Sequence, residues 1–221
     1  MGVSVVLQLG KQISDLKIGI VGSRSDCFSK ILDKEKIQYD KIKVRQIDSS
    51  YDLIFESGLY RIIPPEILKL PKIGIFGTHE TPLPEGRGFC PLQWSVLNKR
   101  EHIVVTLYKL DENVDNGKIV NQTYKPIANL DTIKILDQKR KEGISEGFQL
   151  FIDELRQGFI VLRDQTGTPS YSEQRTPDSC ELDVSKRLAD LWDEIRICNN
   201  EEYPAWFMID DTKIIIKYEI V

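Results

Sequence analysis

Residues 16–22 read LKIGIVG, a nearly continuous apolar run that ends in a glycine. Such a run is typical of a parallel strand that is buried on both faces of a sheet. Residues 25–36 follow with apolar side chains at helical spacing, and Ser25 and Asp26 are suited to cap a helix. Because a buried strand that leads directly into a helix begins a βαβ unit, this stretch predicts an α/β fold.

The alternation of strand and helix patterns continues along the chain. Short apolar runs predict strands at 41–47, 52–56, 72–77, 102–110 and 118–122. Helical spacing or an opening proline predicts helices at 65–70, 91–99 and 132–157. Gly143 and Gly147 either interrupt the last of these helices or mark a close approach to a neighbour. The alternation predicts a Rossmann-like, mostly parallel sheet with flanking helices.

Composition divides the 221 residues into three parts. We expect residues 1–164 to form the α/β core. Residues 165–179 are rich in Ser, Thr, Gly and Pro and show no periodicity, which predicts a linker. Residues 180–221 hold an amphipathic helix pattern at 186–198 and two strand patterns, at 206–209 and 213–220, so we expect a small α+β appendage.

Charge and composition exclude several classes of protein. A net charge of −4 disfavours a nucleic-acid partner, which usually requires a basic surface. The apolar runs are too short to cross a bilayer, and residues 1–10 lack the basic start of a signal peptide, so we expect a cytoplasmic protein with no membrane partner. The four cysteines are widely spaced and there are only two histidines, which predicts reduced thiols and no metal site.

Three polar loops follow predicted parallel strands, at 22–24, 57–58 and 77–79. Ligands of parallel sheets bind outside the carboxyl ends of the strands, so these loops are expected to meet at one rim. Ser23 lies in the first loop, at a strand-to-helix turn whose backbone N–H groups are suited to bind a phosphate. The alternative is that this turn has no ligand, because it lacks a full glycine-rich fingerprint.

The most informative stretch begins HETPLPEGRG at 79–88 and ends LDENVDNG at 110–117. It resembles the folate-dependent formyltransferases, whose fingerprint N-x-H-x-S-L-L-P-x-x-R-G is followed by a strand and a D-E-G-x-D-x-G loop. The resemblance covers about residues 50–210 and implies N10-formyltetrahydrofolate as the co-substrate. It also implies that His79 and Asp115 are the catalytic histidine and aspartate.

The implied reaction explains these residue types. An amine attacks the formyl carbon, so one group must stabilise the tetrahedral oxyanion and another must take a proton from the attacking nitrogen. A histidine beside a carboxylate can take that proton at neutral pH. The alternatives are structural: His79 would cap a turn, and 115–117 would form a plain Asp-Asn-Gly turn.

The resemblance also implies the binding residues. The sequence GLYRII at 58–63 resembles the family's pterin-binding loop, so Arg61, Ile62 and Ile63 are expected to frame the pterin, together with Val114. The resemblance implies that Arg87 borders the acceptor substrate. Trp94, whose ring can stack on a sugar or base, and Ser23, in the turn suited to a phosphate, are also expected to contact the acceptor. The structural alternatives are strand-to-helix packing for 61–63, a surface arginine that closes its loop for Arg87, and a buried core tryptophan for Trp94.

One position departs from the family pattern. The family's asparagine, two residues before the histidine, is Gly77 here. Glycine has no amide to donate to the oxyanion, and the loss of one such donor costs about 10²–10³ in rate. Four explanations stay open: backbone N–H groups and His79 take over, the substrate differs, the enzyme is slow, or the protein is a non-catalytic folate-binding homologue.

The acceptor is predicted by elimination. The segments RTPDS at 175–179 and YPA at 203–205 resemble methionyl-tRNA and sugar N-formyltransferases rather than the enzyme that formylates glycinamide ribonucleotide. Residues 180–221 carry ten acidic and five basic side chains, a poor match for a polyanion. We therefore expect a nucleotide-linked 4-amino-deoxysugar as substrate, as in O-antigen biosynthesis. A methionyl-tRNA formyltransferase-like enzyme acting on another amine stays open, as does a homodimer formed by the exposed C-terminal strands.

Overall fold

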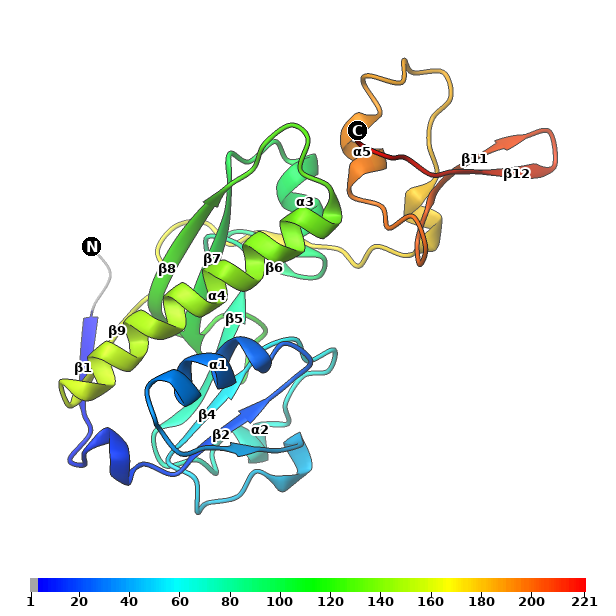
Figure 1. The fold of residues 1–221 in the computed structure, drawn as a ribbon. Helices are drawn as coiled ribbons and strands as arrows, with labels where there is room; N and C mark the ends of the chain where they lie inside the picture. The colour runs from blue at the N-terminus through cyan, green and yellow to red at the C-terminus, as the bar shows by residue number, and fades with distance from the viewer. Residues whose placement is uncertain (1–3) are drawn as a thin grey trace.

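An eight-stranded mixed sheet forms the centre of the protein in a computed structural model that describes residues 4–221 (Figure 1). Residues 1–3, which belong to the predicted core and to the stretch interpreted as lacking a signal peptide, lie outside the described residues. From one edge to the other, the strands are β1 (Ser4–Gln8), β9 (Phe159–Arg163), β8 (Ile119–Pro126), β7 (His102–Lys109), β5 (Gly74–His79), β4 (Leu53–Glu56), β2 (Ile18–Val21) and β3 (Asp40–Lys41).

The direction of the strands agrees with the predicted fold class. β3, β2, β4 and β5 are parallel neighbours, whereas every pair from β5 to β1 is antiparallel. β8 and β1 therefore run in the direction of β5, and only β7 and β9 oppose it. The Rossmann-like, mostly parallel sheet is confirmed. Strands β9 and β1 extend it at the far edge and were not predicted from the sequence.

Two helices cover one face of the sheet. α4 (Ile133–Arg156) crosses β7, β8 and β9 and packs against α1 (Asp26–Lys34), as Figure 1 shows. α2 (Pro65–Leu68) and α3 (Pro91–Leu97) are shorter. Aromatic rings with centroids 4.7–6.3 Å apart fill the space between helices and sheet, and each is fully buried. They belong to Phe28, Phe55, Phe76, Phe148 and Phe151.

The two glycines of α4 mark a close approach and do not interrupt the helix. The carbonyl of Gly143 accepts a hydrogen bond of 2.9 Å from Thr123 Oγ1 on β8, and that of Gly147 accepts one of 2.9 Å from Asn121 Nδ2. A Cβ at Gly143 would lie 2.7 Å from Val105 Cγ2. Helix and sheet can therefore approach this closely only because these positions have no side chain.

Two predicted elements are shorter than expected. The strand predicted at 41–47 is only β3, after which Val44–Gln46 forms a 3₁₀ turn, because Ile42, Val44 and Ile47 pack as a separate cluster against Tyr51 instead of pairing. The helix predicted at 186–198 is only α5 (Trp192–Arg196). Its first half has no apolar neighbour to bury Leu188, and Asp183 Oδ1 accepts the Ser185 N–H at 3.0 Å, which favours a turn.

The C-terminal appendage has an apolar cluster of its own. α5 packs beside a hairpin formed by β11 (Ala205–Ile209) and β12 (Thr212–Ile216), which projects away from the sheet in Figure 1. The cluster consists of Cys180, Leu182, Leu191, Ile195, Cys198, Ala205 and Trp206. All four cysteines of the chain are free thiols.

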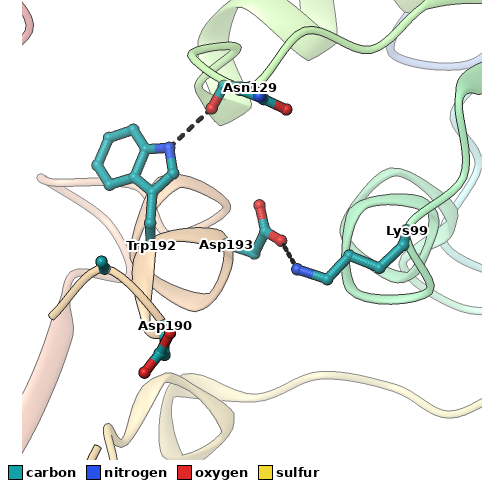
Figure 2. Close-up of a pocket in the computed structure, with 6 residues that line it drawn as sticks. Lys99, Asn129, Asp190, Trp192 and Asp193 are labelled. Atoms are coloured by element: carbon teal, nitrogen blue, oxygen red, sulfur yellow. Dashed lines mark hydrogen bonds and ion pairs between the residues drawn. The ribbon is translucent and has the colours of Figure 1, made fainter. Parts of the chain in front are cut away.

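The appendage is fixed to the core at a polar seam, shown in Figure 2. Trp192 Nε1 donates a hydrogen bond of 2.7 Å to the Asn129 carbonyl, and Lys99 pairs with Asp193. Arg196 Nη1 donates to two further core carbonyls, at 2.8 and 2.9 Å. Lys99, Asn129, Trp192 and Asp193 line a pocket of about 380 Å³, and none of the predicted site residues lines it.

Two structural features bear on membrane and metal partners. Within residues 4–221, no helix combines the length and the apolar character that crossing a membrane requires. Over the same residues, His, Cys, Asp and Glu side chains nowhere gather in a group of three that could hold a metal ion.

Candidate active site

His79 and Asp115 meet at the end of β5. The loop between β7 and β8 folds back over this strand, and Asp115 Oδ2 lies 3.5 Å from His79 Nδ1. The two side chains are 8% and 13% exposed, so little water competes for their charges. The structure brings together the two residues that the sequence predicted as a pair, although their roles stay predictions.

The Asp115 carboxylate is held by two donors. Tyr108 on β7 donates its hydroxyl to Oδ1 at 2.7 Å, and the backbone N–H of Gly88 donates to Oδ2 at 2.8 Å. Burial and the neighbouring Asp115 charge raise the pKa of the Tyr108 hydroxyl well above its usual range. The phenol therefore remains a neutral donor, and the carboxylate is fixed in both position and orientation.

The ring of His79 is oriented by a carbonyl group. His79 Nε2 lies 2.8 Å from the Gly86 carbonyl oxygen, which can only accept, so Nε2 carries the proton. In the neutral ring, Nδ1 is then the unprotonated nitrogen, and it faces Asp115. A proton that arrives at Nδ1 converts this contact into an ion pair, so the arrangement is suited to a base that takes up one proton.

The predicted linker contributes to this site. Residues 165–172, hereafter the strap, run along the 84–90 loop, where β10 (Tyr171–Ser172) pairs in parallel with β6 (Arg87–Gly88). Ser170 Oγ accepts the Gly86 N–H at 2.9 Å. Gln165 Nε2 donates to the carbonyls of Asp115 and Gly117 at 2.9 and 2.8 Å. The strap therefore holds the 115–117 segment, which includes Asp115, and the 84–90 loop, whose Gly86 carbonyl contacts His79.

Arg87 is buried under the strap. Its side chain donates to Gln165 Oε1 at 2.6 Å and to the Tyr171 hydroxyl at 3.3 Å, while its buried Nε has no hydrogen-bond partner among the described residues. The guanidinium thus joins the 84–90 loop to the strap. Its predicted contact with an acceptor substrate stays a prediction.

The residues predicted to bind the pterin lie on two neighbouring loops. Ile62 and Val114 are exposed, whereas Ile63 is buried, backbone included. Arg61 is exposed on the same loop as Ile62. Lys69, which directly follows α2, forms an ion pair of 2.6 Å with Glu112 on the loop that carries Val114. The exposed apolar side chains of Ile62 and Val114 are suited to contact a flat ring system such as a pterin, and the pterin contacts of all four residues stay predictions.

Ser23 precedes the pair in the sequence, Trp94 lies between its two members, and their surroundings differ. The exposed Ser23 donates its hydroxyl to the Gly58 carbonyl at 2.9 Å, which joins the first polar loop to the second. Trp94 is half-buried, and its Nε1 donates to the Glu173 carbonyl at 2.8 Å. It lines a groove of about 320 Å³ that also contains Gly86, the carbonyl partner of His79. Their contacts with a substrate stay predictions.

Sequence reasoning missed Glu56, Tyr108 and Gln165. Glu56 ends β4, and its Oε1 accepts the Leu59 N–H at 2.9 Å. Burial raises the pKa of the Glu56 carboxyl to about 7. A charged residue at the end of the apolar strand LIFE was the available signal for it. Tyr108 and Gln165 carried no such signal, because a tyrosine in a strand and a glutamine in a loop are common.

Several known proteins are similar to this chain in sequence and in fold. A family model described as formyl transferase matches residues 25–152. A methionyl-tRNA formyltransferase from Thermodesulfovibrio yellowstonii is 28% identical over 197 residues, which cover 88% of this chain and 63% of that protein. The chain spans less than two thirds of the length of the curated relatives that it matches.

Solved structures agree with the family match. A 4-N formyltransferase from Francisella tularensis superposes with a TM-score of 0.76 at 19% identity, covering 94% of this chain and 99% of that chain. The formyltransferase PseJ from Anoxybacillus kamchatkensis, in complex with UDP-4,6-dideoxy-4-formamido-L-AltNAc and tetrahydrofolate, gives a TM-score of 0.59 at 24% identity, covering 72% and 85%. At these identities the likeness shows the fold. Since the family match extends over more than half of its length, this chain belongs to the formyl transferase family.

Proposed function

We propose that this protein transfers the formyl group of N10-formyltetrahydrofolate to the amino group of a nucleotide-linked 4-amino-deoxysugar. The observation that carries the proposal is the His79–Asp115 pair, with 3.5 Å between Nδ1 and Oδ2 and the opposite ring nitrogen fixed on Gly86. Family membership supports the transferred group, and PseJ, whose structure holds tetrahydrofolate and a formylated nucleotide sugar, supports both substrate classes.

The chain's own residues account for the proton transfers. When bound, N10-formyltetrahydrofolate supplies the formyl group. His79 takes the proton that the attacking amine loses, at the nitrogen that faces Asp115, and the carboxylate stabilises the imidazolium. Tyr108 and Gly88 keep the carboxylate in place while the charge on the ring changes. His79 then returns the proton to N10 as the bond between N10 and the formyl carbon breaks and the new amide forms.

The charges of the appendage support a small acceptor over a tRNA. Each of its five basic side chains already has a partner. Four of them pair with acidic side chains, and Lys213 lies 3.8 Å from the centre of the Trp206 ring. A polyanion gains most from basic groups that are free to bind phosphates. Binding of tRNA by this surface would first require these pairs to break.

The test is formyl transfer from 10-formyltetrahydrofolate to a panel of acceptors. The panel contains dTDP- and UDP-linked 4-amino sugars, methionyl-tRNA and small amines, and the products are tetrahydrofolate and the formylated acceptor, detected by absorbance and mass spectrometry. We expect transfer to one of the nucleotide sugars. Transfer to methionyl-tRNA alone would replace the proposed acceptor, and folate binding without transfer to any acceptor would support a non-catalytic homologue.

A further inference from the structure

Gly77 leaves a space in the sheet beside the catalytic pair. In the register of the sheet, Gly77 lies between Glu56 on β4 and Tyr108 on β7. Side chains that are directly opposite on neighbouring strands share a face, as do side chains two positions apart on one strand. Glu56, Tyr108 and His79 therefore all project from the face on which Gly77 has no side chain.

The carboxyl group of Glu56 fills that space. A Cβ built at position 77 would lie 2.8 Å from Glu56 Oε2 and 2.5 Å from Leu110 Cδ1. An asparagine at this position would have to displace one or both of these groups. The glycine at position 77 and the glutamate at position 56 are thus a matched pair: the second side chain occupies the volume that the first one vacates.

The hydrogen bonds of Glu56 leave one oxygen available. Its side chain is buried, with 9% of its surface exposed, and Oε1 accepts the Leu59 N–H at 2.9 Å. Among the residues that the structure describes, no donor reaches Oε2. The Tyr108 hydroxyl on the neighbouring strand is already committed to Asp115. Of the polar side-chain atoms of Glu56 and Tyr108, Oε2 is therefore the one that is available to hydrogen-bond a substrate.

Burial is the largest influence on the pKa of Glu56, and the neighbouring charges act in both directions. Arg24, from the loop after β2, is the positive group that faces it, but this arginine also pairs with Glu80 at 3.4 Å. Arg140 on α4 lies 4.0 Å from Glu80 as well. The negative charges of Glu80 and Asp115 add to the effect of burial, and together they raise the pKa of Glu56 to about 7. A large fraction of the carboxyl group is therefore protonated near neutral pH.

We propose that Glu56 supplies the hydrogen-bond donor that Gly77 lacks, with its protonated carboxyl group donating from Oε2 to the oxygen that becomes the oxyanion during formyl transfer. The proton stays on Glu56 throughout, so the step changes no covalent bond. This inference rests on the proposed function. It gives a chain without the family's asparagine another hydrogen-bond donor for the oxyanion.

Two other roles for Glu56 make different predictions. If Glu56 only anchors the 57–63 loop through Leu59, its removal changes the KM for the folate and the thermal stability but leaves kcat unchanged. If an ionised Glu56 accepts a hydrogen bond from the pterin, Glu56→Gln raises the KM for the folate. A carboxyl group that donates to the oxyanion affects kcat, and it does so only while it is protonated. Measuring whether each variant changes kcat or KM, and how kcat depends on pH, therefore separates the three roles.

The experiment compares kcat against pH for the wild-type protein, Glu56→Gln and Glu56→Ala. Glu154→Gln is the matched control. Like Glu56, Glu154 is partly buried, has a raised pKa and accepts a backbone N–H, which comes from Val161 at 3.3 Å. Glu154 lies at the C-terminal end of α4, away from the site. We expect the wild-type kcat to fall above pH 7, and we expect this fall to be absent in Glu56→Gln, whose amide donates at every pH. Glu56→Ala is expected to lose about 10²–10³ in kcat, and the double variant Gly77→Asn with Glu56→Ala to regain at least tenfold.

A measurement without substrate completes the test. The infrared difference spectrum between wild type and Glu56→Gln should contain the C=O band of a protonated carboxyl group. This band is expected to disappear as the pH rises, with a midpoint near pH 7. An ionised Glu56 at pH 5.5, or an alkaline limb that persists in Glu56→Gln while the wild type is active, overturns this inference alone. A wild-type protein that formylates no acceptor overturns the proposed function as well, so the two failures are distinguishable.

Discussion

The Tyr108 hydroxyl donates a hydrogen bond of 2.7 Å to Asp115 Oδ1, from the strand that pairs directly with β5. This bond links the sheet to the loop that carries the carboxylate, and it leaves Oδ2 to face His79. The position of the Asp115 carboxylate is thus fixed from a strand of the sheet as well as from its own loop.

Tyr108→Phe is expected to lower kcat about 10- to 100-fold, because a hydrogen bond to a charged group contributes about 1.5–3 kcal/mol. The phenyl ring retains the buried packing, so the fold should remain intact. Steady-state kinetics with circular dichroism as the control for folding measure this effect. An unchanged kcat would mean that the Asp115 carboxylate needs no support from the strand.

Gln165→Ala is expected to weaken both activity and stability. The substitution removes the partner of a buried arginine nitrogen and two donors to the 115–117 backbone, and an unpaired buried group costs about 1–3 kcal/mol. Thermal denaturation should show a lower Tm, and kcat should fall while the KM for the folate changes little. Gln174→Ala, an exposed glutamine beyond the strap, is the control. Equal behaviour of the two variants would show that the strap does not support the site.

The raised pKa of Glu56 predicts how stability depends on pH. The folded protein holds this proton up to about pH 7, whereas the unfolded chain releases it near 4.5. The stabilisation from Glu56 is therefore fully present below 4.5 and is lost as the pH rises through 7, by up to about 3 kcal/mol. Chemical denaturation should show that Glu56→Gln gains stability relative to wild type between pH 5 and pH 8. A difference that is constant over this range would contradict the assignment.

The parts of the fold that depend on local pattern could be predicted from the sequence. The order β2, α1, β4, β5 followed from apolar runs alternating with one helical stripe, and these elements lie within two or three residues of the expected positions. The pairing of β1 with β9 could not, because Ser4 and Arg163 are joined only by the completed sheet. The position of segment 165–172 could not be predicted either, because a short polar segment has no periodicity and this one pairs with residues 87–88, which are distant in sequence.

Some residues of the site could likewise be predicted from the sequence, and others could not. His79 and Asp115 could be identified because they lie in motifs with characteristic residue types, and the structure places them side by side. Glu56 had a signal in the sequence, as a charged residue at the end of an apolar strand, but its position opposite Gly77 is a property of the sheet. The departure at Gly77 could be seen in the sequence, but the group that fills the space could not.

The most direct measurement is formyl transfer to a nucleotide-linked 4-amino sugar by wild type, His79→Asn and His102→Asn. His102 is an exposed histidine at the start of β7 and serves as the matched control. The account predicts transfer by wild type and His102→Asn, and at least a 10³-fold loss in His79→Asn with folding and folate binding retained. Transfer by His79→Asn at the wild-type rate would contradict it.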